Sequence, residues 1–222
     1  MKISAAVLKS LDAGLAVLKI ELSSVQLRQL HDYLALLLQW NATYNLTAIR
    51  EPQQMVQLHL LDSLAILPVL MRLTGGSAAR ILDVGAGAGL PGIVLAIVRP
   101  EWHVDLIDTV QKKAAFMRQA TAQLRLSNST VIHGRVEALE TNEQSAYDLL
   151  VSRAFSDLAS FIQVAGFLLK PGGCLVAMKG RLATESNAVL PSGWCVDNIH
   201  RLSIPGLAAE RHLIVAKRIA AL

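Results

Sequence analysis

The stretch Ile81–Gly92, which reads ILDVGAGAGLPG, decides how the rest of the chain is interpreted. Four glycines fall within eight residues, directly after one short apolar run and before another. Because glycine has no Cβ atom, such a turn lets another group come close to the backbone. In α/β proteins a turn of this kind joins a strand to a helix at the ligand-binding edge of the sheet. We expect a ligand-binding loop here, with a purely structural tight turn as the alternative.

Composition indicates a folded chain with a large core. The 222 residues are 53% hydrophobic and 17% charged, which is the profile of a globular protein and not of a disordered one. The formal net charge of +4 fits a polyanionic partner, but an excess of this size is common and excludes little by itself.

Metal centres, disulfides and membrane anchors are not expected. The two cysteines, Cys174 and Cys195, have no CxxC spacing and the six histidines form no HxxxH pair, so we expect reduced thiols and no metal site. Only six uncharged residues separate Lys2 from Lys9, too few for a signal peptide. No run approaches the about 18 consecutive apolar residues of a membrane span. We expect a cytoplasmic protein that acts as a monomer.

The two parts of the chain differ in pattern. Residues 1–73 contain a single glycine, Gly14, and their apolar residues recur at helical spacing. The expected helices cover residues 7–18, 25–40 and 52–73. Pro68 is expected to interrupt the third helix. We interpret residues 1–73 as an N-terminal helical extension and residues 74–222 as the main domain, with the Gly-rich link 74–77 between them.

From Arg80 onward, β-like runs alternate with helical segments. The expected strands are RILDV (80–84), HVDLID (103–108), TVIHG (130–134), YDLLVS (147–152), GCLVAMK (173–179), WCVDNIHRLSI (194–204) and ERHLIVAKRI (210–219). The helical segments are 89–98, 110–125 and 156–169, and residues 169–173 are expected to form the turn that ends the last of them. No helix separates the last two runs, which predicts an antiparallel pair. The pattern predicts an α/β, Rossmann-like, seven-stranded and mostly parallel sheet.

The spacing of the glycines separates three kinds of ligand. A P-loop needs Lys-Ser or Lys-Thr after its last glycine, and none follows here. Gly87–Gly92 matches the GxGxxG of dinucleotide folds, but it begins three residues after Val84 and contains Pro91. Counted from Gly85, the spacing is GxGxG with Asp83 in the preceding strand, a pattern typical of class I methyltransferases that use S-adenosylmethionine (SAM). An NAD-linked oxidoreductase and a non-catalytic nucleotide-binding regulatory module remain the alternatives.

Asp108 ends the next expected strand, about 20 residues after the glycines, where an acid can bind ribose hydroxyls. Asp108 is equally placed to cap the helix that follows at Val110, and the two roles are compatible. Asp105 lies in the same strand but too far inside it to reach a ligand. This acid does not separate SAM from NAD, since both contain a ribose.

Five separated motifs together resemble one family. They are WNATYNLTAIR (40–50), HLLDSL (59–64), DVGAGAGLPGI (83–93), RVEAL (135–139) and VSRAF (151–155). In this order they resemble the RsmG family of bacterial methyltransferases, also called glucose-inhibited division protein B, from about residue 25 to the last strand. The resemblance implies SAM-dependent methylation of guanine N7 at position 527 of 16S rRNA, in the small ribosomal subunit.

The resemblance also implies cofactor contacts at Gly85, Leu90, Val136, Glu137 and Arg153. The glycine spacing and the strand ends add Asp83, Gly87 and Asp108 to the candidate cofactor-binding residues. Leu90 can supply an apolar wall, and Glu137 follows a strand at the ligand-binding edge, although a solvated carboxylate at a helix start is the alternative. Arg153 is flanked by apolar residues and is expected to face an anionic ligand or an acid such as Asp83.

Contacts to RNA are expected from two regions. The candidate substrate residues are Tyr44, Asn45, Arg50, His59, Lys179, Arg181 and Arg201. Trp40, Asn41, Tyr44 and Asn45 suit an unstacked base, but Trp40 also fits the apolar stripe of its helix and Asn45 also fits a turn or cap. His59 and Asp62 are three residues apart and are expected to hydrogen-bond each other. The remaining cations are expected to contact phosphates or to stay solvated.

No catalytic residue is assigned. The chain lacks the [DN]PP[YF] tetrapeptide of amino-nitrogen methyltransferases and the Pro-Cys nucleophile that pyrimidine C5 methylation needs. Guanine N7 carries a free lone pair, so it can attack a sulfonium methyl group without losing a proton. Alignment and exclusion of water then suffice for catalysis.

Overall fold

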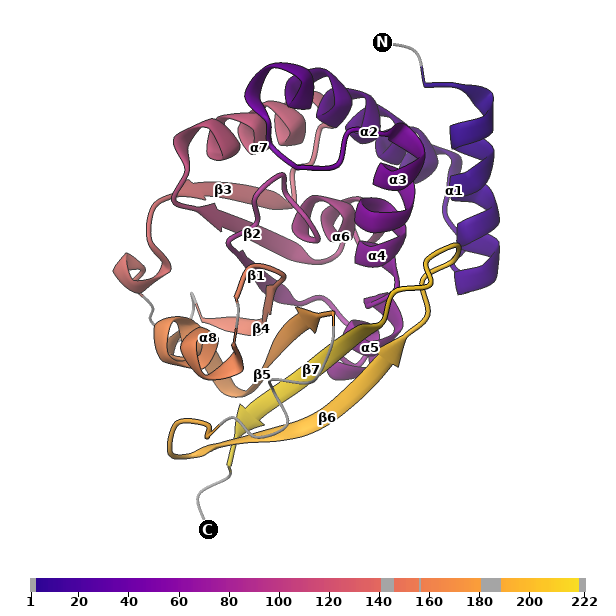
Figure 1. The fold of residues 1–222 in the computed structure, drawn as a ribbon. Helices are drawn as coiled ribbons and strands as arrows, with labels where there is room; N and C mark the ends of the chain where they lie inside the picture. Colours follow the sequence, from indigo (N-terminus) through magenta and orange to yellow (C-terminus); the bar gives the residue numbers. More distant parts are fainter. Residues whose placement is uncertain (1–2, 141–145, 156, 181–188, 220–222) are drawn as a thin grey trace.

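The structure is a computed structural model that describes residues 3–140, 146–155, 157–180 and 189–219. The described residues form a seven-stranded sheet in the order β3-β2-β1-β4-β5-β7-β6 (Figure 1). The strands are β1 (Arg80–Val84), β2 (His103–Asp108), β3 (Ser129–His133), β4 (Tyr147–Ser152), β5 (Leu169–Lys179), β6 (Trp194–Leu202) and β7 (Arg211–Arg218). β7 runs antiparallel to both of its neighbours, β5 and β6, and the other strands are parallel to one another. The predicted sheet and its antiparallel closing pair are confirmed.

The prediction of a turn at 169–173 is wrong. The preceding helix ends earlier, in the single 3-10 turn η3 (Gly166–Leu168), and β5 already begins at Leu169, opposite Tyr147 of β4. The register then shifts, so that the next pair is Leu149 with Cys174. A β-bulge therefore accommodates the extra residues, and the glycine pair allows it: Gly172 has a φ of +79°, and a Cβ atom on Gly173 would lie 3.0 Å from the Asp148 carbonyl oxygen.

Helices cover both faces of the sheet. They are α1 (Ala5–Leu18), α2 (Ser24–Tyr44), α3 (Pro52–Met55), the π-helix η1 (Val56–Leu61), α4 (Asp62–Leu64), α5 (Leu67–Leu73), α6 (Gly92–Val98), α7 (Gln111–Gln123), the 3-10 turn η2 (Val136–Ala138) and α8 (Leu158–Ala165). Alternate side chains of β1 point to opposite faces: Ile81 joins the apolar cluster formed with α1–α7, and Leu82 joins the cluster that contains α8. The sheet is therefore buried on both sides.

The N-terminal helices share one core with the sheet, and α2 is fixed to the rest of the chain by polar contacts. Gln26 donates to the carbonyl oxygens of Ile97 and Val98 at the end of α6, at 3.2 and 3.0 Å. The Tyr33 hydroxyl, which is fully buried, donates to the Ala88 carbonyl oxygen in the glycine-rich turn at 2.6 Å. A helix from the first part of the chain thus supports the turn that the sequence singled out. The division of the chain at residues 73 and 74 stays a prediction.

The segment Pro52–Leu73 is a core element with an interrupted helix. By length and composition it is apolar enough to cross a membrane, against the expectation from uninterrupted apolar runs, but 67% of its most apolar window is buried inside the structure. The interruption lies between Leu64 and Leu67, so the expected break occurs just before Pro68, which stands in the first turn of α5. The π-helical turn η1 carries His59 and delivers Asp62 to the end of the sheet.

Candidate functional site

The glycine-rich turn adopts a backbone that side chains disfavour. Gly85, Gly87 and Gly89 have φ values of 70°, 61° and 80°. The turn is held to the end of β2, where the N–H groups of Gly85 and Ala86 donate to the Ile107 carbonyl oxygen at 2.9 and 3.0 Å. A Cβ atom on Gly85 would lie 2.8 Å from the Cβ atom of Ala154, whereas on Gly87 it would meet nothing closer than 3.9 Å. The space above Gly87 is therefore open, and the space at Gly85 is filled by protein.

Three cavities lie in a row along the carboxyl edge of the sheet. The outer cavity, of about 350 Å³, lies beyond β2 and β3 and includes Asp108, Val136 and Glu137 in its wall. The loop cavity, of about 200 Å³, lies on the glycine-rich turn and includes Thr47 and Leu90. The basic cavity, of about 290 Å³, lies toward β5 and β7 and includes Asp62, Lys179 and Arg211.

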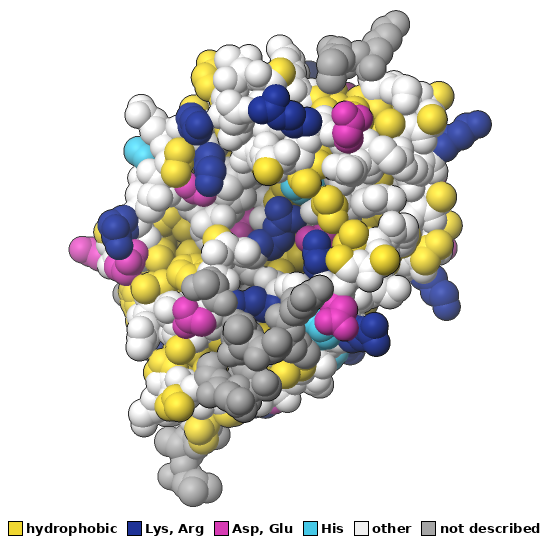
Figure 2. All heavy atoms as spheres, viewed as in Figure 1, with side chains coloured by type: hydrophobic (Ala, Val, Ile, Leu, Met, Phe, Trp, Pro, Cys, Tyr) yellow, Lys and Arg dark blue, Asp and Glu magenta, His cyan; other side chains and the backbone are white. Residues whose placement is uncertain are grey.

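Shared lining residues place the three cavities next to one another. Gly85 and Ala154 line both the outer and the loop cavity, and His59 and Arg153 line both the loop and the basic cavity. In Figure 2, dark-blue Lys and Arg side chains meet magenta acid side chains in a hollow near the centre of the face shown. Such a row at the carboxyl ends of parallel strands is where open α/β sheets bind ligands. It suits an elongated ligand with a second molecule at one end.

Asp83 lies beneath the turn and is fully buried. Its Oδ2 atom accepts a hydrogen bond from the Gly92 N–H at the start of α6, at 2.7 Å. Its Oδ1 atom is buried and has no hydrogen-bond partner among the described residues. Burial raises the pKa of this carboxyl group to about 7, against the lowering effects of the Gly92 bond and the Arg153 charge. An unsatisfied acceptor of this kind is a position where a ligand donor would be stabilised.

Asp108 connects β2 to both neighbouring turns. Its Oδ2 atom accepts from the Gly87 N–H at 2.9 Å, and its Oδ1 atom accepts from the Val110 N–H at 2.8 Å. Asp108 is not the N-cap residue of α7 that the alternative had it to be: Val110 holds that position and no side chain caps the helix, so Asp108 only fixes the turn before it. Asp108 also lines the outer cavity, where its carboxylate is placed to meet a ligand.

The other predicted cofactor residues line the same two cavities. Val136 is buried in the wall of the outer cavity, and Glu137 lies beside it with an exposed side chain that pairs with Arg135 at 3.0 Å. The backbone and the Arg135 side chain lower the pKa of Glu137, which is therefore ionised. Leu90 is buried in the wall of the loop cavity, next to Gly87. The structure brings all eight predicted positions to the carboxyl edge of β1, β2, β3 and β4.

Arg153 pairs with Asp62 and not with Asp83, the acid that the sequence suggested. Its Nη1 atom donates to Asp62 Oδ2 at 3.2 Å and to the Leu58 carbonyl oxygen at 3.2 Å, so Asp62 rather than Asp83 is its partner. Asp62 is buried, and its Oδ1 atom accepts from Arg211 Nε at 3.2 Å. Burial raises the pKa of Asp62, and the two arginines oppose that rise. One buried carboxylate thus links α4, the end of β4 and the start of β7.

The predicted hydrogen bond between His59 and Asp62 is wrong. The His59 Nε2 atom lies 3.0 Å from Thr47 Oγ1, and Nδ1 lies 2.9 Å from the Leu58 carbonyl oxygen. Burial, together with the Arg153 charge, lowers the pKa of His59 to about 4, so the ring is neutral at pH 7. With Nδ1–H donating to the carbonyl oxygen, Nε2 accepts from the threonine hydroxyl. The π-helical geometry turns His59 away from Asp62 and toward the loop cavity.

The residues expected to contact RNA do not form one cluster. Tyr44 is 44% exposed and its ring lies 5.0 Å from that of Trp40, which also contacts the buried Phe116, so Trp40 packs against the core. Asn45 caps α2 in the left-handed conformation, as the alternative had it, and accepts from Arg50 at 2.9 Å.

Of the other four substrate candidates, Lys179 and His59 lie together and Arg201 lies apart from them. Lys179 lines the basic cavity and donates to the Phe155 carbonyl oxygen at 2.8 Å. His59 lies in that cavity too, and Arg201 is exposed on β6. Arg181 lies outside the described residues. Asn41, by contrast, is buried and bonds within the loop that follows α2, donating to the Ile49 carbonyl oxygen at 2.9 Å.

Three residues of the site were missed. Thr47 and Arg211 line the cavities, and Tyr33 fastens the glycine-rich turn from below. Thr47 lies inside the first motif of the family resemblance (40–50), so the sequence could have indicated it. Arg211 begins the last strand, and no local pattern indicates its role, because its partner Asp62 is 149 residues away in sequence.

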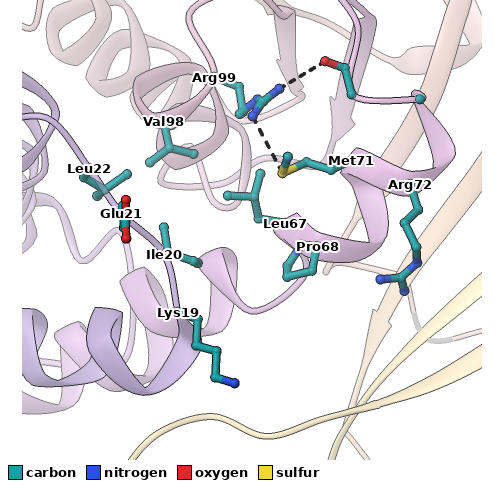
Figure 3. Close-up of a pocket in the computed structure, with 12 residues that line it drawn as sticks. Lys19, Ile20, Glu21, Leu22, Leu67, Pro68, Met71, Arg72, Val98 and Arg99 are labelled. Carbon is teal, nitrogen blue, oxygen red and sulfur yellow. Dashed lines mark hydrogen bonds between the residues drawn. The ribbon is translucent and has the colours of Figure 1, made fainter.

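A larger cavity than these three lies at the opposite edge of the sheet. It has a volume of about 630 Å³ and is formed by the α1–α2 link, α5 and the end of α6, including Leu67 and Met71 (Figure 3). Arg99 lines it and donates to Met71 Sδ and to the Gly76 carbonyl oxygen. No residue of the glycine-rich turn lines it, so size alone would point away from the candidate site. Within the described ranges, no group of three His, Cys, Asp or Glu side chains is placed to hold a metal ion.

Comparison with known proteins places the chain in a family. The profile of the family GidB, described as rRNA small subunit methyltransferase G, matches residues 26–214. The chain belongs to this family. It is 53% identical over 203 residues to the ribosomal RNA small subunit methyltransferase G of Burkholderia ambifaria, which covers 90% of this chain and 88% of that protein. The protein of the same name from Burkholderia pseudomallei is 52% identical over 206 residues, covering 92% and 88%.

A solved structure shares the fold. The crystal structure of TrmN from Thermus thermophilus superposes with a TM-score of 0.53 over 74% of this chain and 53% of that chain, at 19% identity. The predicted Rossmann-like sheet, mostly parallel and of class I methyltransferase type, is therefore confirmed, and so is the resemblance to the RsmG family. The row of three cavities lies within the matched part of the chain.

Proposed function

We propose that the chain transfers a methyl group from SAM to guanine N7 at position 527 of 16S rRNA. Its membership of a small-subunit rRNA methyltransferase family supports the reaction and the substrate class. The resemblance of its motifs supports the base and the position. The observation that carries the proposal is the row of adjacent cavities at the carboxyl edge, with space for a cofactor and for an acceptor.

The outer and loop cavities fit SAM. Asp108 and Glu137 offer carboxylate oxygens for ribose hydroxyls, and Val136 offers an apolar wall for the adenine ring. The open space above Gly87 leaves room for a ligand against the backbone, and the unpaired Asp83 Oδ1 beneath it can accept from the ammonium group of the methionine part. When bound, SAM supplies an electrophilic methyl group on a sulfonium. These residues form our proposed cofactor site, with Gly85, Leu90 and Arg153 completing the wall.

The protein's own contribution is alignment, screening and exclusion of water. No residue has to remove a proton, because guanine N7 carries a free lone pair that would accept the methyl group directly from bound SAM. The neutral His59 places no positive charge beside the sulfonium. Asp62 balances the Arg153 charge at the wall shared by the loop and basic cavities. Fixed dipoles and charges of this kind need no rearrangement during the reaction.

The alternatives weighed from the sequence are answered differently. An NAD-linked oxidoreductase is set aside because the chain belongs to a methyltransferase family. A non-catalytic nucleotide-binding module can be separated from an enzyme only by an assay of methyl transfer. We further propose that the protein works as a monomer in the cytoplasm, with the small ribosomal subunit as its partner and without a metal ion, and light scattering checks the first of these points.

The test is methyl transfer from labelled SAM to small-subunit rRNA that lacks the modification, offered as naked RNA, as assembly intermediate and as finished subunit. We expect stoichiometric incorporation into at least one form, with the label mapping to N7 of one guanine at position 527. Label at another position would refute the assigned base while leaving the methyltransferase function intact. Absence of label in all three forms, despite SAM binding, would favour the non-catalytic module.

A further inference from the structure

Cationic side chains outnumber carboxylates in the wall of the basic cavity. Among the described residues that line it are the cations Arg153, Lys179 and Arg211 and one acid, Asp62. Each carboxylate oxygen of Asp62 already accepts from one of the arginines. A wall of this composition suits a ligand edge rich in acceptor atoms.

The position of the basic cavity indicates which ligand it holds. The basic cavity shares His59 and Arg153 with the loop cavity, so its occupant lies next to the methionine end of a cofactor in the site proposed above. We propose that the basic cavity holds the unstacked acceptor base, and that Arg211 recognises it by donating to the purine O6 atom. This inference rests on the proposed function and names the residue that reads the base. A base that is methylated by an enzyme has to leave its stack to reach such a cavity.

The geometry of Arg211 leaves one arm of its guanidinium for a ligand. Nε donates to Asp62 Oδ1 at 3.2 Å, and Nη1 donates to the Glu210 carbonyl oxygen at 2.9 Å. No acceptor for Nη2 is found among the described residues. Arg211 lines the basic cavity and its side chain is 26% exposed, so the guanidinium is within reach of a ligand there.

The acceptor pattern of guanine fits that arm. Guanine offers two neighbouring acceptors on one edge, N7 and O6, and arginine is the side chain that most often contacts them. Because N7 has to stay free for the methyl group, O6 is the acceptor that remains. Adenine carries an amino group in place of O6, and that donor would face the guanidinium without a bond. One contact thus separates the two purines.

Asp62 is a positioning residue in this arrangement. Asp62 is 4% exposed, and its two carboxylate oxygens pair with Arg153 and Arg211. Its role is to fix the directions of these two guanidinium groups. A guanidinium held by a buried acid keeps its remaining N–H groups in fixed directions, so little entropy is lost when a base binds.

The experiment pairs a change in the protein with a change in the base. Small-subunit rRNA assembled with either guanosine or 2-aminopurine at the target position is methylated under single-turnover conditions. 2-Aminopurine keeps N7 and lacks O6. Wild type, Arg211→Met and Arg72→Met are compared, since Arg72 is an exposed arginine at the opposite edge of the sheet. SAM affinity is measured for each variant by calorimetry.

Wild type and Arg72→Met should prefer guanosine by about tenfold or more, the loss expected for one hydrogen bond to a charged donor. Arg211→Met should react with both bases at nearly the same reduced rate and bind SAM within about twofold of wild type. Arg211→Lys, which keeps a donor, should retain part of the preference and serves if the methionine variant does not fold. If Arg211→Met and Arg211→Lys both keep the wild-type preference for guanosine, the role of Arg211 is overturned while the proposed function stands. A wild-type protein that methylates neither RNA overturns the proposed function as well.

Discussion

Replacing Asp83 by asparagine tests whether the buried carboxylate beneath the glycine-rich turn serves the ligand despite a cost in stability. The side chain is fully buried, accepts one hydrogen bond from the Gly92 N–H, and has an Oδ1 atom without a partner among the described residues. The pKa of the group rises from 3.8 to about 7 because of burial. A purely structural acceptor for Gly92 would not need a charge.

The expected magnitude follows from linkage. An acid with a raised pKa in the folded state binds more protons folded than unfolded between its two pKa values, so stability falls as the pH rises from about 3.8 to about 7. Between pH 5 and pH 8 the loss from this group is roughly 2–3 kcal/mol, and the whole shift corresponds to about 4 kcal/mol. Asparagine does not titrate, but its buried amide donor costs about 1–3 kcal/mol if it stays unpaired.

At pH 8 we therefore expect Asp83→Asn to be more stable than the ligand-free wild type, with an unfolding free energy about 1–3 kcal/mol higher. Its unfolding free energy should also depend less on pH between 5 and 8. SAM affinity should fall in the same variant, because the charged acceptor is lost. Denaturant unfolding at three pH values and calorimetry measure both effects, with Asp32→Asn on the exposed side of α2 as the control. A variant that keeps the wild-type pH slope, or that binds SAM as tightly, refutes the reasoning.

Further variants test the rest of the site. Asp108→Ala should weaken SAM binding by about 1.5–3 kcal/mol in calorimetry and also lower the melting temperature, since the Gly87 and Val110 N–H groups lose their acceptor; a loss of stability alone would leave only the helix-start role. Gly87→Ala should abolish SAM binding, because the new Cβ atom would enter the open space that the ligand needs. The same variant should lose about 1–2 kcal/mol of unfolding free energy, because alanine disfavours the positive φ. Unchanged binding would show that the ligand lies elsewhere. Tyr44→Ala should cost about 1–3 kcal/mol of RNA affinity without changing its salt dependence, and an altered slope would argue against stacking. Replacing four cations by alanine should reduce the slope of log affinity against log salt by up to about 0.9 for each phosphate contact removed while SAM still binds, and an unchanged slope would move the RNA-binding face elsewhere. These four are Arg50, Lys179, Arg181 and Arg201.

The parts of the fold that the sequence predicts are those determined by local pattern. The runs 80–84 and 103–108 are short, apolar and followed by turn residues, and both are strands with the expected bounds. The Lys-Pro-Gly-Gly run misled because proline and glycine usually end regular structure. Here they make a bulge in β5 opposite Asp148, which depends on pairing with a strand about 20 residues earlier and not on local preference.

The site divides in the same way. Gly87 and Asp108 are predictable because one turn and one strand end place them, and their hydrogen bond at 2.9 Å closes a short loop between adjacent strands. The acid–arginine cluster was not predictable, because Asp62 meets Arg153 and Arg211 only after three distant segments pack together. Sequence analysis expected a local partner for Asp62, His59, but the π-helical turn changes which side chains share a face. Long-range ion pairs and irregular helices carry no periodic signal.

The most direct test of the central claim replaces a single nitrogen of the acceptor, N7, by a C–H group. Small-subunit rRNA carrying 7-deazaguanosine at position 527 lacks only the nitrogen that is proposed to receive the methyl group, while O6 and the rest of the base are unchanged. With this RNA and labelled SAM we predict binding at wild-type affinity and no incorporation of label, whereas the matched guanosine RNA is fully methylated. Incorporation of label into the 7-deazaguanosine RNA would contradict the account.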